Sequence, residues 1–169
     1  MKKLFILILA ITFTACDAPV NQEGAGFFIY DEDEKFVVAS DEVNDVWVKY
    51  IDAHNNRDMD AIRGFNSDSI LVIGPDGARI NGTDEHINFL DTWFSMADPK
   101  WDIYWSMPYK GVTGGEEWVI AGHSVTLKDG EAEVKKNQMI DAKIQDGKVQ
   151  LFYVYQMDVP DVTPAIDTE

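Results

Sequence analysis

Asp141 is the residue whose type and position first suggest chemistry. It interrupts the otherwise apolar segment "MIDAKI", which reads as a strand that enters a tight turn. A carboxyl group at such a position can take part in catalysis or can simply be hydrated. A catalytic role would require Asp141 to face the interior of the fold.

The strand phase around Asp141 argues against that role. Side chains alternate between the two faces of a strand, so Ile140, Ala142 and Ile144 share one face and Asp141 lies on the other. An unpaired carboxylate inside the core would cost several kcal/mol, or would become neutral through a raised pKa. We therefore expect Asp141 to point outward, towards solvent or a dimer interface; an inward Asp141 is the alternative.

The three histidines are further acid–base candidates. His54 ends the first predicted helix, where a positive charge is favourable, so helix capping is its expected role. His86 lies in the first turn of a later helix and is expected to be exposed, whereas His123 is expected in the core or at an interface. Because the three are far apart in sequence and form no i, i+4 pair, we predict no metal site and no cofactor.

Apolar periodicity predicts three helices in the first half of the chain. The first begins at a Ser40 cap and ends at about residue 55, and Asp58 caps a short second helix. The third begins at Thr83 and ends before Pro99. Between the second and third helices, "SILVIG" predicts a buried strand, and "PDGARING" predicts a turn into a short second arm.

The second half has the alternation of antiparallel strands. In "WDIYWSM", the alternation places Trp101, Ile103, Trp105 and Met107 on one face. Three more strands follow: "EWVIAGHSVTL", the segment around Asp141, and "VQLFYVYQMD", joined by "KDGE" and "QDGK" turns. This order predicts an α+β domain in which a curved antiparallel sheet wraps around the three helices.

The N-terminus "MKKLFILILAITFTAC" predicts a signal peptide over residues 1–15. Its apolar run of about ten residues is too short for a bilayer, which requires about 20. The ending "FTAC" resembles the bacterial lipoprotein box, so lipidation of Cys16 is expected; an ordinary secretory signal is the alternative. Cys16 is the only cysteine, so no intrachain disulfide can form.

Composition and the signal define the expected compartment and partners. With 30 acidic and 14 basic residues the formal net charge is −16, which disfavours nucleic acid as a partner. We expect an exported protein, lipid-anchored in the bacterial cell envelope on the periplasmic side or at the outer membrane. Residues 16–26 are predicted to be a flexible tether, the acidic residues 31–34 a solvated turn, and residues 159–169 a frayed tail.

The order of elements from about Asp41 to Asp158 resembles the NTF2-like superfamily, also called SnoaL-like or ketosteroid-isomerase-like, and the domain is expected to span residues 27–158. The resemblance rests on "WVKYIDAHNNRDMDAIRGFNSDSILV", on "GTDEHINFL" as the third helix, and on "DGKV" before the last strand. It implies a cone formed by a curved antiparallel sheet and three helices, with a pocket inside. It also implies a homodimer assembled through the outer face of the sheet.

The resemblance implies roles for particular residues. Ketosteroid isomerases use a tyrosine on the first helix and a protonated aspartic acid on the penultimate strand, and Tyr50 and Asp141 stand at those positions. The position of the carboxylate base is occupied by Ile73 or Gly74. Asp76 follows in a Pro-Asp-Gly turn, where it is expected to bind its local backbone. Steroid isomerisation is therefore not expected.

The expected function is the binding of a small, largely apolar ligand, or of a partner, without catalysis. The pocket is expected to be lined by Trp47, Tyr50, Trp93, Trp105, Phe152 and Gln156. The alternative is an isomerase, lyase, cyclase or hydrolase that acts on a carbonyl or polyketide-like substrate with Tyr50 and Asp141 as donors. A purely structural dimerisation module is the third reading.

Overall fold

The computed structural model describes residues 23–28, 31 and 33–159. The predicted signal peptide and Cys16 lie outside the described residues. The helices are α1 (Asp41–Asn55), α2 (Met59–Phe65) and α3 (Thr83–Ala97). The strands are β1 (Phe36–Val38), β2 (Asn66–Ile73), β3 (Arg79–Asn81), β4 (Lys100–Gly111), β5 (Glu117–Asp129), β6 (Ala132–Gln145) and β7 (Lys148–Asp158).

The helix boundaries lie where the sequence predicts them, although the Ser40 side chain, at the N-cap position of α1, makes no capping hydrogen bond. The Asp58 carboxylate accepts a hydrogen bond from the backbone N–H of Ala61 at 2.9 Å and caps α2. The α3 helix ends at Asp98, whose backbone is left-handed (φ 40°), and Pro99 follows. The three predicted helices are confirmed. None of the helices in the described part of the chain is long and apolar enough to cross a membrane.

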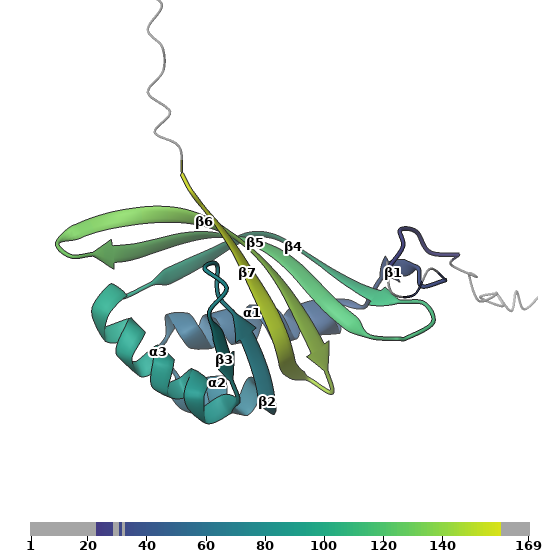
Figure 1. Ribbon diagram of the computed structural model, residues 1–169, viewed down its shortest axis with the longest axis horizontal. Coiled ribbons are helices and arrows are strands. Elements are labelled where there is room, and N and C mark those ends of the chain that lie inside the picture. Colours follow the sequence, from purple (N-terminus) through teal and green to yellow (C-terminus); the bar gives the residue numbers. More distant parts are fainter. Residues whose placement is uncertain (1–22, 29–30, 32, 160–169) are drawn as a thin grey trace, which may run out of the picture.

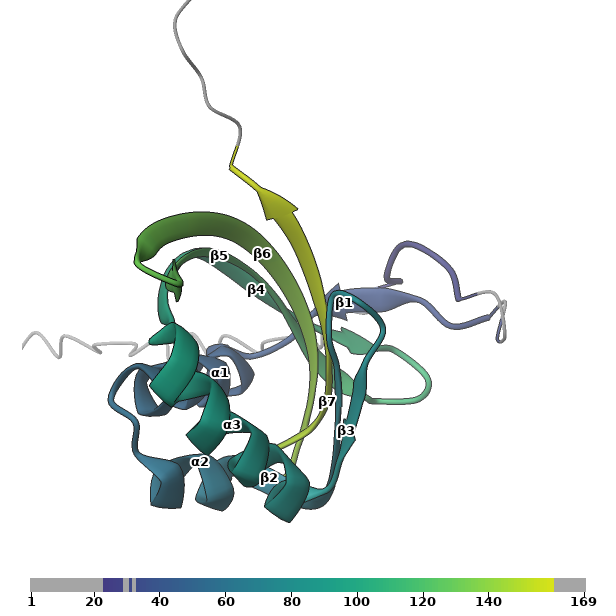
Figure 2. The same cartoon turned by 60° about the vertical axis from the view of Figure 1, so that its left-hand side comes forward.

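The seven strands form one sheet in the order β1-β4-β5-β6-β7-β2-β3. The long strands β4 to β7 pair antiparallel, as the alternation predicts, whereas β2 lies parallel to β7. The sheet is therefore mixed. It arches over the three helices, which all lie on its concave side (Figures 1 and 2). The α1 helix packs chiefly against β4 and β5.

A β-bulge in β4 reverses the predicted orientation of Trp105. Ile103 pairs with His123 and Trp105 pairs with Gly122, so one residue of β4 has no counterpart in β5. An extra residue changes the face that all later side chains occupy. Trp105 therefore lies on the convex face, where it is 39% exposed, and not with Trp101 on the concave face.

Gly122 makes room for the aromatic rings that cover this bulge. A Cβ atom at this position would lie 2.6 Å from Nε1 of Trp105 and 2.6 Å from ring atoms of Tyr104. Atoms cannot approach that closely, so both rings occupy space that any other residue would fill. The bulge places the rings of Tyr104 and Trp105 on the convex face, and Gly122 leaves the space that they occupy.

The chain before α1 is attached to the sheet more closely than the sequence predicts. Ala25, inside the predicted tether, exchanges two backbone hydrogen bonds with Phe36 of β1. The Glu34 carboxylate, predicted to be solvated, is buried and accepts hydrogen bonds from the backbone N–H groups of Thr113 and Gly114. These bonds hold the pKa of Glu34 below its usual value. The carboxylate therefore joins the N-terminal arm to the β4–β5 turn.

Candidate ligand-binding site

A cavity of about 510 Å³ lies between the concave face of the sheet and helices α1 and α3. Its wall is mostly aromatic and aliphatic. Five of the six residues expected in the pocket line it: Trp47, Tyr50, Trp93, Phe152 and Gln156. The sixth, Trp105, is on the convex face for the reason given above. Leu90, Trp101, Ile140 and Val154 are among the further lining residues.

Tyr50 lies at the centre of a buried hydrogen-bond network. Its hydroxyl donates to Oδ1 of Asn66 at 2.7 Å, and Nδ2 of Asn66 lies 3.1 Å from Nδ1 of His86. All three side chains are almost fully buried. Burial raises the pKa of Tyr50 well above its usual value, so the phenol stays protonated. The hydroxyl hydrogen is already used by Asn66 and is not free for a ligand.

His54 and His86 are buried pocket residues, and the sequence-based assignment of both was wrong. His54 does not cap α1 as a cation, because burial lowers its pKa to about 4. His86 is not exposed; burial, together with the nearby His54, lowers its pKa to about 3. Helical spacing contained the signal, because His54 follows Tyr50 by four residues and His86 precedes Leu90 by four.

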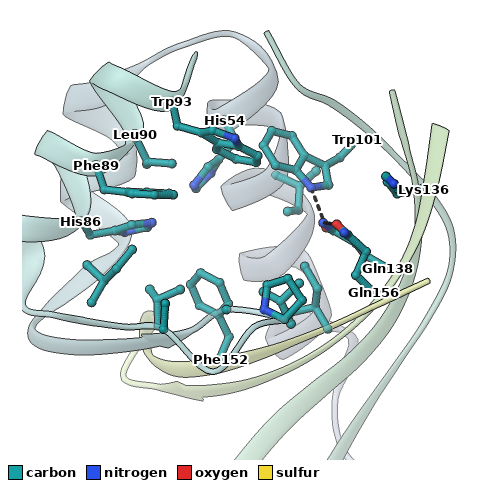
Figure 3. Close-up of a pocket in the computed structure, with 18 of the residues that line it drawn as sticks. His54, His86, Phe89, Leu90, Trp93, Trp101, Lys136, Gln138, Phe152 and Gln156 are labelled. Carbon is teal, nitrogen blue, oxygen red and sulfur yellow. Dashed lines mark hydrogen bonds between the residues drawn. The ribbon is translucent and has the colours of Figure 1, made fainter. Parts of the chain in front are cut away.

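A second polar group lies at the other end of the cavity (Figure 3). Gln138 accepts a hydrogen bond from Nε1 of Trp101 at 3.1 Å and donates to Oε1 of Gln156 at 2.9 Å. Lys136 lies beside them and forms an ion pair with Asp158. The two glutamines are hydrogen-bonded to each other, and the charge of Lys136 is paired with Asp158. This end of the cavity is therefore polar but has no unpaired charge.

Asp141 lies on the convex face, outside the cavity. The cavity-lining residues of β6 are Lys136, Gln138 and Ile140, and Asp141 has the opposite strand phase. Its carboxyl accepts a hydrogen bond from the Tyr109 hydroxyl at 2.9 Å, and burial raises its pKa. Tyr50 and Asp141 therefore lie on opposite sides of the sheet and do not form a donor pair.

The remaining acid–base candidates, Asp76 and His123, form hydrogen bonds within the protein. The Asp76 carboxylate is at the β2–β3 turn, where Oδ1 accepts from the backbone N–H of Ala78 at 3.0 Å. His123 is in the core, and its Nε2 accepts from Nε1 of Trp47 at 3.2 Å. Over the described ranges, no three His, Cys, Asp or Glu side chains gather in a way that could hold a metal ion.

Comparison with known proteins identifies the fold. No protein-family model matches the sequence, and no curated protein matches it. An LEH-like epoxide hydrolase from M. tuberculosis has 18% identity and a TM-score of 0.58, over 69% of this chain and 83% of that one. A Kribbella flavida protein assigned as a ketosteroid isomerase has 16% identity and a TM-score of 0.56, over 77% and 88%.

A third similar structure is a Shewanella putrefaciens protein assigned as a SnoaL-like polyketide cyclase. It has 15% identity and a TM-score of 0.56, over 70% of this chain and 91% of that one. Identities this low establish the fold and no activity. The chain has the α+β NTF2-like fold, with three helices and a curved, unclosed sheet, as the resemblance in the sequence indicated.

The buried histidines predict a loss of stability in mild acid. The pKa of His54 falls from 6.5 in the unfolded chain to about 4 in the folded one, so only the unfolded chain gains this proton between those pH values. The difference, 6.5 − 4 = 2.5 units, corresponds to about 3 kcal/mol of stability that is present at pH 7 and lost by pH 4.

Urea unfolding at several pH values between 4 and 7 measures this dependence. The His54→Phe variant, which keeps a ring but cannot titrate, is expected to lose less stability over this interval than the wild type. His86 titrates in the same direction and is retained in the variant, so a residual slope is expected. Equal slopes for the two proteins would contradict the assignment of a neutral, buried His54.

Proposed function

We propose that this domain binds a small, largely apolar ligand in the cavity beneath the sheet and does not convert it chemically. The volume of about 510 Å³ is within the range of small-molecule sites, roughly 300–1,000 Å³. Aromatic and aliphatic side chains supply most of the wall, which favours apolar ligands through burial of their surface. This aromatic cavity is the observation that carries the proposal.

The charge distribution supports binding in preference to proton transfer. Among the described residues that line the cavity, Asp76 is the acidic residue and Lys136 is the basic residue. Asp76 accepts a backbone hydrogen bond from Ala78, and Lys136 forms an ion pair with Asp158. The deeper polar groups are a neutral phenol and two imidazoles with lowered pKa values. A group that removes a proton from carbon works best with a pKa near the working pH, which none of these has.

A catalytic alternative remains for this fold. The similar structures are assigned as an epoxide hydrolase, an isomerase and a cyclase, so the fold accommodates such chemistry. In this chain such an activity would be that of an isomerase or cyclase acting on a carbonyl compound. Tyr50 and Asp141 could not act on one substrate atom, since the sheet separates them.

We also propose that the protein forms a homodimer through the convex face of the sheet. Large side chains are exposed there to between 39% and 59%: Tyr104, Trp105, Met107, Tyr155 and Met157. Exposed aromatic and methionine side chains gathered on one face are typical of a protein interface. Asp141, bound to Tyr109 and already half-buried, would become more deeply buried at such an interface.

The proposed location is the bacterial cell envelope, with lipidated Cys16 as the anchor. The supporting observations are the "FTAC" sequence and the apolar run before it. The acidic surface would be repelled by anionic lipid headgroups, so attachment would depend on acyl chains, each contributing about 0.8 kcal/mol per buried CH₂.

Filling the cavity should abolish ligand binding. Val154 lines the cavity from β7, whereas its neighbour Tyr153 has the opposite strand phase. Titration with N-phenyl-1-naphthylamine, an uncharged fluorescent probe, should give saturable binding to the wild type. Val154→Trp should weaken this binding at least about tenfold because the new ring occupies the space. Tyr153→Trp is the matched control and should bind as the wild type does; absence of saturable binding to the wild type would refute the proposal.

Charges on the convex face should dissociate the dimer. The double variant Met107→Glu, Tyr155→Glu places two carboxylates in the proposed apolar interface, where they would lose their hydration. Light scattering should report a dimer for the wild type and a monomer for this variant. Met96→Glu, on the exposed side of α3, is the control and should remain dimeric. A monomeric wild type would rule out the interface.

Substitution of the proposed lipidation site should release the protein from membranes. Cys16→Ser removes the only thiol, so no acyl chain can be attached there by a thioether bond. After expression in a bacterium, the wild type and a Thr14→Ser control should fractionate with membranes and show the acyl mass in mass spectrometry. Membrane association of Cys16→Ser equal to that of the wild type would contradict lipid anchoring.

A further inference from the structure

His54 and His86 approach each other inside the cavity from two different helices. His54 comes from the last turn of α1 and His86 from the first turn of α3 (Figure 3). Their ring centres are 5.9 Å apart, with 38° between the ring planes. Each ring uses Nδ1 for a contact within the protein, and within the described chain neither Nε2 atom has a hydrogen-bond partner.

The two free Nε2 atoms face open space. Both histidines line the cavity, and neither Nε2 is among the polar atoms that are sealed from solvent without a partner. Figure 3 shows both rings directed from the helices into the cavity. An atom in this position is available to a bound molecule.

The partner of His54 determines where its proton lies. Nδ1 of His54 is 2.7 Å from the backbone carbonyl oxygen of Tyr50. A carbonyl oxygen can only accept a hydrogen bond, so Nδ1 carries the proton and donates it. In a neutral ring the other nitrogen has a free lone pair. His54 therefore presents a hydrogen-bond acceptor, Nε2, to the cavity.

The partner of His86 places its proton on the opposite atom. The Tyr50 hydroxyl donates to Oδ1 of Asn66, which turns the amide Nδ2 of Asn66 towards Nδ1 of His86 at 3.1 Å. An amide nitrogen can only donate, so Nδ1 of His86 is the acceptor. The proton of His86 is therefore on Nε2, and this ring presents a hydrogen-bond donor to the cavity.

The pair is uncharged at neutral pH. Burial lowers the pKa of His54 to about 4 and that of His86 to about 3. The apolar part of the cavity therefore contains one neutral acceptor and one neutral donor, close together, and no charge at this end. Such a pair distinguishes ligands by their hydrogen-bonding pattern and not by their charge.

We propose that the His54–His86 pair binds an uncharged hydroxyl group of an otherwise apolar, ring-bearing ligand. The hydroxyl donates its hydrogen to Nε2 of His54, and its oxygen accepts the hydrogen of Nε2 of His86. The ring centres are 5.9 Å apart, and two hydrogen bonds to one oxygen atom span up to about 5.6 Å, so a single hydroxyl has the size needed to bridge the two rings. The inference rests on the proposed ligand-binding function and specifies the ligand's polar group.

This arrangement disfavours other oxygen groups. An ether or a ketone can accept from His86 but has no hydrogen for His54, so the His54 lone pair would be buried without a partner. A carboxylate would in addition bring a charge into a site without an opposite charge. Selection of a hydroxyl over its ether is the kind of discrimination that buried polar groups produce most strongly.

Nitrogen NMR tests the two tautomers without any ligand. In protein with ¹⁵N-labelled histidine at pH 7, long-range proton–nitrogen spectra distinguish the protonated from the unprotonated ring nitrogen. His54 is expected to carry its proton on Nδ1 and His86 on Nε2; His54→Phe and His86→Phe assign the signals. The same tautomer in both rings, or a doubly protonated ring, overturns the inference and leaves the binding proposal intact.

Three matched molecules test the recognition itself: 2-naphthylmethanol, its methyl ether, and 2-methylnaphthalene. Each is titrated as a competitor of N-phenyl-1-naphthylamine. The alcohol is expected to bind about tenfold more tightly than either of the others, because it alone satisfies both histidines. In His54→Phe this preference should fall to about twofold or less.

Tyr153→Phe is the matched control, because it removes a polar group on the opposite face of the sheet, outside the cavity. This variant should keep the preference for the alcohol. Equal binding of all three molecules to the wild type, or loss of the preference in Tyr153→Phe together with its retention in His54→Phe, overturns the role of the histidines while the cavity remains a ligand site. Failure of all three and of the fluorescent probe to bind refutes both proposals.

Discussion

The hydrogen bond from the Tyr50 hydroxyl to Asn66 links the three parts of the molecule that enclose the cavity. Tyr50 is on α1, Asn66 begins β2, and the Asn66 amide continues the chain of contacts to His86 on α3. All three side chains are almost fully buried, so the Tyr50 hydroxyl, the Asn66 amide and Nδ1 of His86 depend on one another for partners. A change in the position of α3 relative to α1 would leave buried donors or acceptors unpaired. The network therefore fixes the spacing of the two helices, and with it the width of the cavity.

The aromatic side chains around this network hold the cavity open. Trp47, Tyr50 and Phe152 meet edge to face or at a tilt, with ring centres 5.5–6.3 Å apart. Rigid rings in this geometry leave space between them that flexible aliphatic chains would fill. The curvature of the sheet carries Gln138 and Gln156 to the opposite end of that space. An apolar interior with a different neutral polar group at each end is better suited to orienting a molecule than to transferring protons.

Local signals in the sequence predicted the helices, the strands and the face of the sheet that carries Asp141. The features that depend on pairing between distant strands were not predicted. The Asp58 cap and Pro99 act within a few residues of their own position, so the ends of α2 and α3 could be predicted. The face of Trp105 could not, because the extra residue in β4 appears only once the pairing with β5 is known. The parallel pairing of β2 with β7 has the same origin. For His54 and His86 the predicted roles were wrong, because helical spacing places both on the apolar faces of their helices, where burial determines their state.

The attachment of Glu34 to the β4–β5 turn has a mechanical consequence. A force applied to the chain ahead of Glu23 would first load the backbone hydrogen bonds between Ala25 and Phe36. The next resistance would come from the Glu34 carboxylate and its two backbone donors. Both lie at the end of the arch formed by β1 and the β4–β5 turn (Figure 1). A pull along the chain would therefore load this edge of the sheet before it loads α1, whose position sets the shape of the cavity.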